Sequence, residues 1–262
     1  MEEGVKSLER AFQIVEQVSL EKNGIGITEL ATKLEMYKST VHRVLNTLVH
    51  LGYVEQDRHT EKYKLGYKWL AVSSRLLSNL DIRKVAYPYL QELADHTGEV
   101  IHLVVLDGHE VVYIEKVEGT QTIRMHSQIG KRVPVHCTGV GKAILAYLPP
   151  ATLKKVLSGC EWLAHTPHTL TTEDELLEHL KKVRELGYAF DLEENELGIS
   201  CAAAPIWDYT GKVAASISVS GPTTRMQKER LEETAKLVRE YGQKISVSLG
   251  YSKDFQVIAS TK

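Results

Sequence analysis

The side chains best suited to recognising another molecule are gathered between Tyr37 and Leu51. Apolar residues recur there with the period of a helix, which predicts one face packed in a core. The opposite face has no carboxylate and carries hydrogen-bond donors or small polar groups, namely Lys38, Ser39, Thr40, His42, Arg43 and Asn46. Because phosphates repel acids and base edges accept Arg and Asn, this face is suited to the DNA major groove.

A second group of residues could bind a small molecule. The glycines of HCTGVGKA allow close backbone approach, and the helix that they open points free N–H groups and its positive end outward, which suits a carboxylate. Asp191, an acid among apolar neighbours, could accept a hydrogen bond from a ligand hydroxyl. We therefore expect a small organic acid, with a hydroxyl or keto group, as the ligand.

Small and polar residues also occupy one face of a predicted strand. In VAASISVSG, Ser216, Ser218 and Ser220 point one way and the larger apolar residues point the other. The strand ISCAAAP could turn either Cys201 and Ala203 or the alternate residues toward these serines. Such a face either leaves room for a ligand or makes space for a packed helix, and the sequence leaves both readings open.

Other chemistry is weakly supported. A phosphate-loop reading of Gly141-Lys142 fails, because His136 stands where the first glycine must be and Ala143 where Ser or Thr must be. A dinucleotide site would need a βαβ unit, which the pattern lacks. His136-Cys137 suggests a nucleophile or a metal pair, yet no histidine or cysteine shows a known ligand spacing. We expect no metal and no cofactor.

The elements that position the DNA-facing residues form a short series. Helices are predicted near 5–19, 28–34 and 37–51, with Thr28 as the cap of the second and with Leu8, Phe12, Val15 and Val18 of the first facing inward. Strands near 53–56 and 62–65 would follow, joined by a turn that offers Arg58 and Lys62 to DNA. Helix, helix, helix and hairpin make a winged helix-turn-helix.

The rest of the chain mixes helices and strands without βαβ alternation, which predicts an α+β fold with a largely antiparallel sheet. A helix over 67–80 should link the two halves and bury apolar surface partly against a second copy. Asp107-Gly108 predicts a hairpin, and Thr172 to Glu175 a capping box. Helices are expected near 81–98 (started or kinked by Pro88), 139–147, 150–157, 172–187 and 224–249, and strands near 122–127, 188–192, 199–205 and 212–220.

Composition excludes several classes of protein. A net charge of −2 and a pI near 6.6 give no overall attraction to nucleic acid or membranes, so DNA affinity must come from a few placed contacts. No apolar stretch is long enough to span a bilayer. The three cysteines lack any CxxC pairing, which favours a reducing cytoplasm.

These residues resemble the IclR family of bacterial transcriptional regulators over nearly the whole chain. SLERAFQIVEQV, ITELATKLEMYKSTVHRVLNTLVHLGYVEQD and YKLGYKWLAV are similar to the family's DNA-binding half. DIRKVAYPYLQELADHTGEVIHLVVLDGHEVVYIEKVEG, VPVHCTGVGKAILAYLP and GISCAAAPIWDYTGKVAASISVSGP are similar to its effector half.

The resemblance implies a winged helix-turn-helix domain over 1–66, a linker helix over 67–80, a GAF-like effector domain over 81–250 and a tail over 251–262. It implies a cytoplasmic homodimer or tetramer, more often a repressor, on pseudo-palindromic double-stranded operator DNA. Carried over by motif, the effector would meet backbone groups of Gly139 and Val140 and the side chains of Asp191, Cys201, Ser218 and Ser220. Cys137 departs from the small residue, such as Ala, that many members have.

Two other classes stay open at this point. One is an enzyme tethered to a DNA-binding module and using Cys137 or Cys201. The other is a redox or metal sensor built on His136, Cys137 and Cys201. The family resemblance favours a regulator that is not an enzyme and that senses a small carboxylate.

Overall fold

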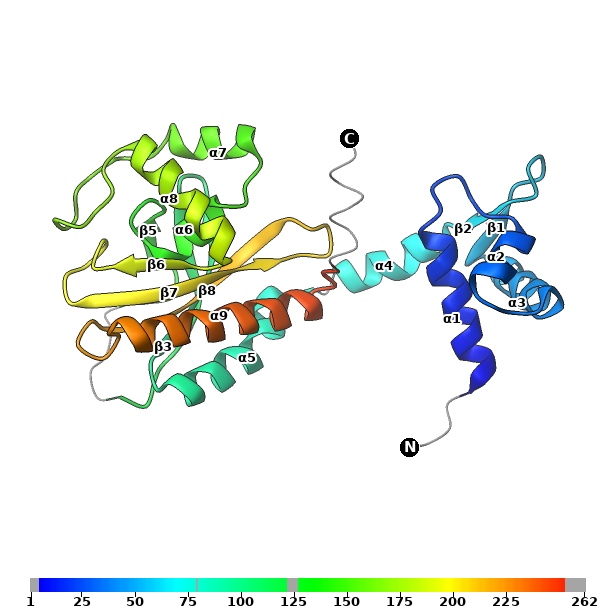
Figure 1. Ribbon diagram of the computed structural model, residues 1–262, viewed down its shortest axis with the longest axis horizontal. Coiled ribbons are helices and arrows are strands. Elements are labelled where there is room, and N and C mark those ends of the chain that lie inside the picture. Colours follow the sequence, from blue (N-terminus) through cyan, green and yellow to red (C-terminus); the bar gives the residue numbers. More distant parts are fainter. Residues whose placement is uncertain (1–4, 79, 122–126, 253–262) are drawn as a thin grey trace. The chain divides into compact units, whose positions relative to one another are not determined.

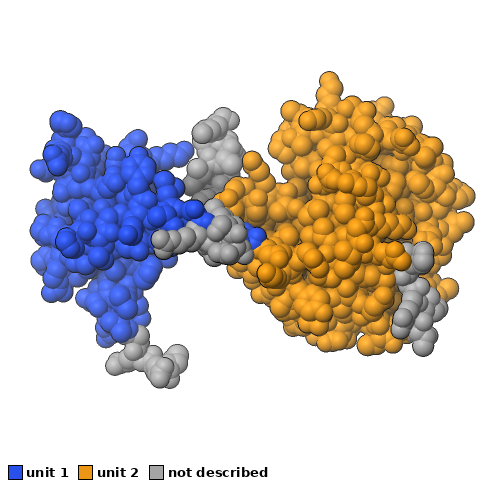
Figure 2. Space-filling model, turned by 180° about the vertical axis from the view of Figure 1, so that it is seen from behind, with its two compact units in different colours: residues 1–80 blue, residues 81–262 orange. Residues whose placement is uncertain are grey.

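The computed structural model describes residues 5–78, 80–121 and 127–252 (Figure 1). The chain divides into two compact units, residues 1–80 and residues 81–262 (Figure 2). We call them the N-terminal unit and the C-terminal unit, and each is described by itself. Within the described residues, no helix is both long enough and apolar enough to cross a membrane.

The N-terminal unit is a winged helix-turn-helix, as predicted. Helices α1 (Lys6–Ser19), α2 (Ile27–Lys33) and α3 (Lys38–His50) precede the antiparallel pair β1 (Val54–Gln56) and β2 (Tyr63–Leu65). Its core gathers fully buried side chains from each helix and from β1, among them Ile14, Leu30, Leu45 and Val54. Gly52 lies in the turn between α3 and β1, and its φ of +79° is one that glycine adopts without strain.

Two predictions about these helices were wrong. Leu8 and Phe12, predicted to face inward, are 58% and 59% exposed; Val18 is buried as predicted, and so is Ile14, which was not predicted. Helix α1 carries two apolar stripes, and the period alone cannot tell which of them packs in the core. Thr28 is not a cap either, because α2 already begins at Ile27 after the extended residue Gly26.

Helix α4 (Lys68–Ser78) follows the wing. The indole Nε1 of Trp69 donates to the carbonyl oxygen of Tyr53 at 2.9 Å, and the two rings meet edge to face with centroids 4.9 Å apart. These contacts fix the start of α4 to the winged helix. Three large apolar side chains nearby remain exposed, namely Tyr67, Leu70 and Val72.

The C-terminal unit contains a six-stranded sheet in the order β5-β4-β3-β8-β7-β6 (Figure 1). Every neighbouring pair in this sheet is antiparallel, which confirms the predicted α+β class. The strands are β3 (Val100–Asp107), β4 (Glu110–Val117), β5 (Arg132–Pro134), β6 (Ala189–Leu192), β7 (Ile199–Trp207) and β8 (Val213–Pro222). The helices are α5 (Ile82–Thr97), α6 (Gly139–Leu145), α7 (Pro150–Leu157), α8 (Glu173–Leu186) and α9 (Lys228–Ser248).

Helices cover both faces of this sheet. A Cβ placed on Gly139 of α6 would meet the Cβ of Ala203 at 3.3 Å, and one on Gly242 of α9 would meet that of Ala204 at 3.4 Å. Because successive strand residues face opposite sides, α6 and α9 lie on opposite faces of β7. Figure 1 shows α5 beside α9, and α7 and α8 beyond α6. The alanines of β7 therefore let helices approach closely on both sides.

Some predictions of turns, caps and strands in this unit are confirmed and others are wrong. The hairpin at Asp107-Gly108 is present, and Thr172 caps α8 by accepting from the amide of Glu175 at 3.3 Å. The Glu175 carboxylate accepts from the amide of Thr171 instead of Thr172. Helix α5 begins at Ile82 and continues through Pro88, so the proline does not start it. Most of the strand predicted near 122–127 lies outside the described residues, and β5 was not predicted.

Candidate functional site

The outer face of α3 presents the polar residues that the sequence singled out. Val41 and Leu45 are fully buried on its inner side. Opposite them, the exposed side chains are Lys38, Ser39, His42, Arg43 and Asn46, and Thr40 is half-buried. Tyr37, just before the helix, is 85% exposed and was not selected from the sequence. Its phenol next to a polar face is typical of a phosphate contact.

One hydrogen bond orders this face. Asn46 Nδ2 lies 3.3 Å from His42 Nδ1, one helical turn away. An amide nitrogen can only donate, so Nδ1 of His42 accepts and its proton sits on Nε2. The amide oxygen of Asn46 and the Nε2–H of His42 are not used in this bond. Such a mixed acceptor and donor pattern can read base edges.

The wing is the hairpin of β1 and β2, and hydrogen bonds to one side chain hold its turn. The carboxylate of Asp57 accepts from the amides of His59 and Thr60, both at 2.9 Å. Those bonds help to hold the pKa of Asp57 below its usual value. Arg58 and Lys62 are exposed on this turn. Both predicted wing residues are therefore exposed, and an acid directly precedes each of them, Asp57 before Arg58 and Glu61 before Lys62.

A cavity opens in the C-terminal unit between α6 and the sheet. All six residues predicted for an effector line it: Gly139, Val140, Asp191, Cys201, Ser218 and Ser220. Its volume is about 40 Å³. Typical ligand pockets offer roughly 300–1,000 Å³, so an organic ligand would have to displace side chains here.

Strand register resolves which residues face the serines. Cys201 pairs with Ser220 and Ala203 with Ser218. Cross-strand partners share a face, so the Cys201 and Ala203 set lies on the serine side of β7. Gly139 packs tightly over this small-residue surface, because a Cβ there would lie 3.3 Å from the Cβ of Ala203, closer than ordinary van der Waals contact. The sheet therefore accommodates both the packed helix α6 and the cavity beside it.

His102 is the main cavity residue that sequence reasoning missed. It is nearly fully buried, with Nε2 2.7 Å from Ser127 Oγ and Nδ1 3.3 Å from Ser220 Oγ. Burial, aided by the charge of Lys116, lowers its pKa to about 3, so the ring is neutral. Other unpredicted lining residues are Tyr113, Ser127, Lys131, Thr138, Asn195 and Glu196. An isolated histidine in an apolar strand was the available signal, but only the β3–β8 register places it by the serines.

One of the free backbone amides at the N-terminus of α6 already has a hydrogen-bond acceptor. The Thr138 hydroxyl accepts from the amide of Gly141 at 3.2 Å and donates to the carbonyl oxygen of Pro134 at 2.7 Å. The first amides of a helix have no acceptor within the helix. The amides of Gly139 and Val140 are therefore the ones that helix geometry leaves for a ligand.

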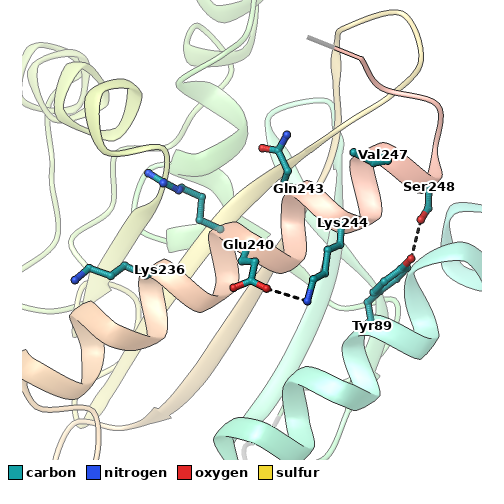
Figure 3. Close-up of a pocket in the computed structure, with 8 residues that line it drawn as sticks. Tyr89, Lys236, Glu240, Gln243, Lys244, Val247 and Ser248 are labelled. Atoms are coloured by element: carbon teal, nitrogen blue, oxygen red, sulfur yellow. Dashed lines mark hydrogen bonds and ion pairs between the residues drawn. The ribbon is translucent and has the colours of Figure 1, made fainter.

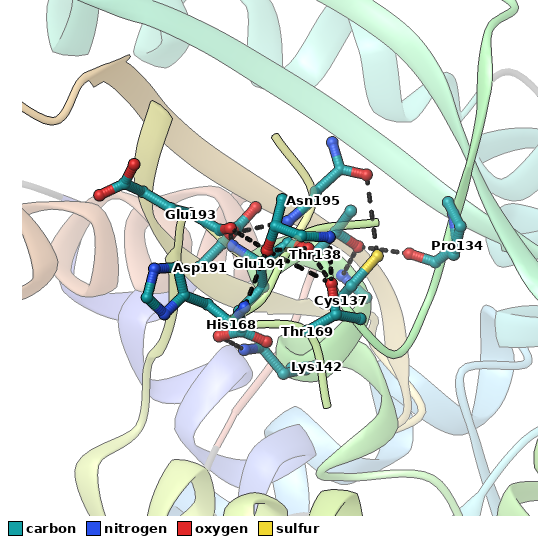
Figure 4. A network of polar contacts seen from close by, with 12 residues as sticks. Pro134, Cys137, Thr138, Lys142, His168, Thr169, Asp191, Glu193, Glu194 and Asn195 are labelled. Atoms are coloured by element: carbon teal, nitrogen blue, oxygen red, sulfur yellow. Dashed lines mark hydrogen bonds and ion pairs between the residues drawn. The ribbon is translucent and has the colours of Figure 1, made fainter. Parts of the chain in front are cut away.

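Asp191 belongs to a buried charged network (Figure 4). Its Oδ1 accepts from the amides of Glu194 at 2.8 Å and Asn195 at 3.4 Å. Burial raises the pKa of Asp191 to about 7, although the positive charge of Lys142 opposes the rise. Asp191 therefore carries less negative charge at neutral pH than an ordinary aspartate does.

Lys142 and Glu194 form a buried ion pair next to Asp191. Lys142 is fully buried in α6, and burial raises the pKa of Glu194 despite the pairing. Within the part of the chain that the structure describes, the second carboxylate oxygen of Glu194 has no hydrogen-bond partner. The lysine first noticed in a failed phosphate-loop pattern thus serves as the counter-ion of a buried acid.

A broader hollow along α9 offers a contrast (Figure 3). Its lining is mostly exposed, and four of its polar side chains pair with one another: Lys244 with Glu240 at 2.9 Å and Tyr89 with Ser248 at 2.8 Å. None of the described residues that line it is a buried polar group, whereas His102, Ser220 and Asp191 are buried around the first cavity. We therefore place the candidate ligand site between α6 and the sheet.

Comparison with known proteins gives consistent matches. The family model described as "IclR helix-turn-helix domain" matches residues 7–58, and "Bacterial transcriptional regulator IclR C-terminal" matches residues 74–247. The chain is 40% identical over 249 residues to the HTH-type transcriptional regulator KdgR of Escherichia coli (strain K12), covering 95% of this chain and 94% of that protein. It is 38% identical over 247 residues to the regulator XynR of the same strain, covering 94% and 98%. The crystal structure of the Thermotoga maritima IclR matches with a TM-score of 0.64 and 36% identity, covering 94% and 99%.

Proposed function

The chain belongs to the IclR family of bacterial transcriptional regulators, and from this premise we propose that it binds a pseudo-palindromic DNA operator through α3 and senses a small carboxylate in the cavity beside α6. It is a DNA-binding regulator with a ligand-binding C-terminal domain, and not an enzyme. The proposal includes repression as the sign of control and the bacterial cytoplasm as its place.

The exposed, acid-free outer face of α3 is the observation that carries the DNA half. Arg43 and Asn46 are the residue types that pair with guanine and adenine edges in the major groove, and Lys38 and Ser39 suit phosphate. Arg58 and Lys62 of the wing would contact the flanking backbone. Selection of bound duplexes from a random pool, followed by gel shift, tests this half; no enrichment of any sequence would reject it.

The exposed apolar stripe of α1 supports a homodimer. Val5, Leu8 and Phe12 follow one another at helical spacing and are all more than half exposed. A second copy of the chain would cover this stripe and supply the second α3 that a pseudo-palindrome requires. Phe12→Asp should shift the sedimentation coefficient toward the monomer, whereas Gln13→Asp on the same helix should not.

The groups around the cavity suit a carboxylate that also bears a hydroxyl or keto oxygen. The amides of Gly139 and Val140 and the hydroxyls of Ser218 and Ser220 can donate, and neutral His102 can donate or accept. Asp191, with its pKa near 7, repels a bound anion less than an ordinary aspartate would. Lys131 at the rim adds the positive charge that steers an anion inward.

Control of DNA binding would run through the chain connection between the units. An effector that opens the cavity would favour one arrangement of the paired DNA-binding units over another through α4. It can change operator affinity only by the difference in its own affinity for the two arrangements. For a repressor, the arrangement that the effector favours is the one with weaker DNA binding.

Isothermal titration with pyruvate-sized and sugar-acid-sized carboxylates tests the effector half. Ser218→Ala should weaken binding of the active compound by about fivefold to tenfold, since one hydrogen bond is worth roughly 1 kcal/mol. Ser216→Ala is the matched control, because Ser216 lies on the same strand but donates to the carbonyl oxygen of Ala204. Equal losses in the two variants, or no heat with any carboxylate, would reject the assignment.

The rival assignment of a cysteine nucleophile has little physical support. Burial raises the pKa of the Cys201 thiol well above its usual value and that of Cys137 to about 12. Only the thiolate is a strong nucleophile, so neither thiol is activated. Family membership points the same way, because the matched relatives bear the names of transcriptional regulators.

A further inference from the structure

Three potential metal ligands converge at one end of α6. The nearest donor atoms of His136, Cys137 and His165 all lie within 4.8 Å of one another. His136 and Cys137 immediately precede the cap residue Thr138, and His165 comes from the segment between α7 and α8. The separation of 28 positions along the chain hides this set from any search by local spacing.

The surroundings of His136 prepare it to bind a cation. Its Nε2 lies 3.3 Å from the carbonyl oxygen of Leu163, which can only accept, so Nε2 carries the proton. Nδ1 then keeps its lone pair for a cation. A histidine held through its second nitrogen by a backbone carbonyl is the usual arrangement of a metal ligand. The Trp162 ring packs beside it at 5.5 Å.

A cavity gives access to these ligands. A cavity of about 190 Å³ reaches His136 and His165 and is also lined by His109 and Glu161. His165 is exposed, so its ring can adjust by the small distance that coordination needs.

We propose that His136, Cys137 and His165 form a binding site for a borderline-soft divalent metal ion such as Zn²⁺. Two imidazoles and one thiolate make a donor set that Zn²⁺ accepts in tetrahedral geometry, with a fourth position left for water. On binding, the Sγ–H bond of Cys137 breaks, its proton passes to solvent, and the sulfur donates its electron pair to the metal.

The site adjoins the effector cavity through one hydrogen bond. The Cys137 thiol donates to the side-chain Oδ1 of Asn195 at 3.7 Å. The backbone N–H of Asn195 in turn donates to Asp191 Oδ1 at 3.4 Å. Asn195 and Asp191 both line the cavity. A metal-bound thiolate has no proton to donate, so the metal frees the Asn195 side chain. This link to effector sensing rests on the proposed function, whereas metal binding itself does not.

Titration of the metal-free full-length chain with Co²⁺ tests the site directly. We expect about one ion per chain and a thiolate-to-cobalt charge-transfer band in the near ultraviolet, which Zn²⁺ should abolish by displacement. Cys137→Ser should remove that band. His165→Ala, an exposed change that leaves the core intact, should weaken Co²⁺ binding at least as much as the roughly 10–100-fold that loss of an outer-shell partner costs.

Matched controls keep the result interpretable. Cys160→Ser and His168→Ala change a nearby thiol and a nearby imidazole outside the set and should leave Co²⁺ affinity within about twofold. Binding without the charge-transfer band, or equal losses in the His165 and His168 variants, would overturn the site. Asn195→Ala should tighten metal binding about twofold to fivefold, because a weak hydrogen bond of the protonated thiol is lost. An unchanged affinity in that variant would overturn the link to Asn195, whatever the effector proves to be.

Discussion

The polar side chains on the outer face of α3 are exposed to solvent, whereas those around the cavity beside α6 are buried. On α3 the proposed DNA-facing side chains are exposed, and Val41 and Leu45 on the opposite face of the helix are buried in the apolar core. Around the cavity they are themselves buried: Ser220 pairs with His102, and Asp191 accepts from the backbone amides of Glu194 and Asn195. The first surface costs the fold almost nothing, because water solvates it until DNA arrives. The second imposes a desolvation cost on the fold before any ligand binds.

The largest expected effect lies in the buried ion pair. Lys142→Met should lower the free energy of unfolding of the C-terminal unit by about 3–5 kcal/mol, since it leaves Glu194 buried without a counter-ion. Urea denaturation followed by tryptophan fluorescence measures this. Lys142→Met with Glu194→Gln should recover a substantial part of the loss. A cost below about 1 kcal/mol for the single variant would erase the contrast drawn between the two regions.

The next effect depends on pH. The pKa of Asp191 is raised from 3.8 to about 7 in the folded chain. The wild-type carboxyl therefore costs stability that grows as the pH rises from about 4 to about 7 and is constant above. Asp191→Asn removes this cost, so the stability of the variant relative to wild type should rise by at most about 4 kcal/mol between pH 4 and pH 8. Thermal or urea unfolding at both pH values checks it, and a difference independent of pH would mean that the wild-type carboxyl titrates normally.

The α3 face should show the reverse behaviour. Arg43→Ala should weaken operator binding by about 1–3 kcal/mol if the guanidinium reads a base, or by less and with a smaller salt slope if it meets phosphate. Stability should change by no more than about 0.5 kcal/mol, because the side chain is exposed. Gel shifts at several salt concentrations, paired with thermal melts, measure both. Unchanged shifts at every salt concentration would remove Arg43 from the interface.

The smallest effect concerns a position outside both surfaces. Thr172→Ala removes the cap of α8 and should cost about 1 kcal/mol of stability without altering DNA or effector affinity. Thr171→Ala, one residue earlier, retains the cap and serves as the control in the same thermal melts. A loss of effector binding in the Thr172 variant would show that α8 takes part in the site.

The same contrast explains what the sequence could predict. The exposed face of a single helix follows from the spacing of its apolar residues. The polar residues from Lys38 to Asn46 could therefore be assigned to that face without knowledge of the fold. Local turn and cap chemistry likewise predicted the Asp107-Gly108 hairpin and the Thr172 cap. In the C-terminal unit, the resemblance named Gly139 and Ser220 but could not place His102. That histidine reaches the cavity only through the pairing of β3 with β8, a long-range fact.

Errors also had a physical source. Helix α1 has apolar residues on more than one side, and only tertiary packing selects Ile14 over Leu8 and Phe12. Strand β5 has three residues and too few alternations to be recognised by period. The grouping of His165 with His136 and Cys137 depends on a loop path that no local rule encodes.

The order of the six strands has a consequence for self-association. The sheet ends in β5 and β6, of three and four residues, and its longest strands lie inside. Pro134 in β5 has no amide hydrogen to offer a neighbouring chain. Short edge strands that include a proline are poor templates for an added strand, so the sheet is protected against being extended by a strand from another chain.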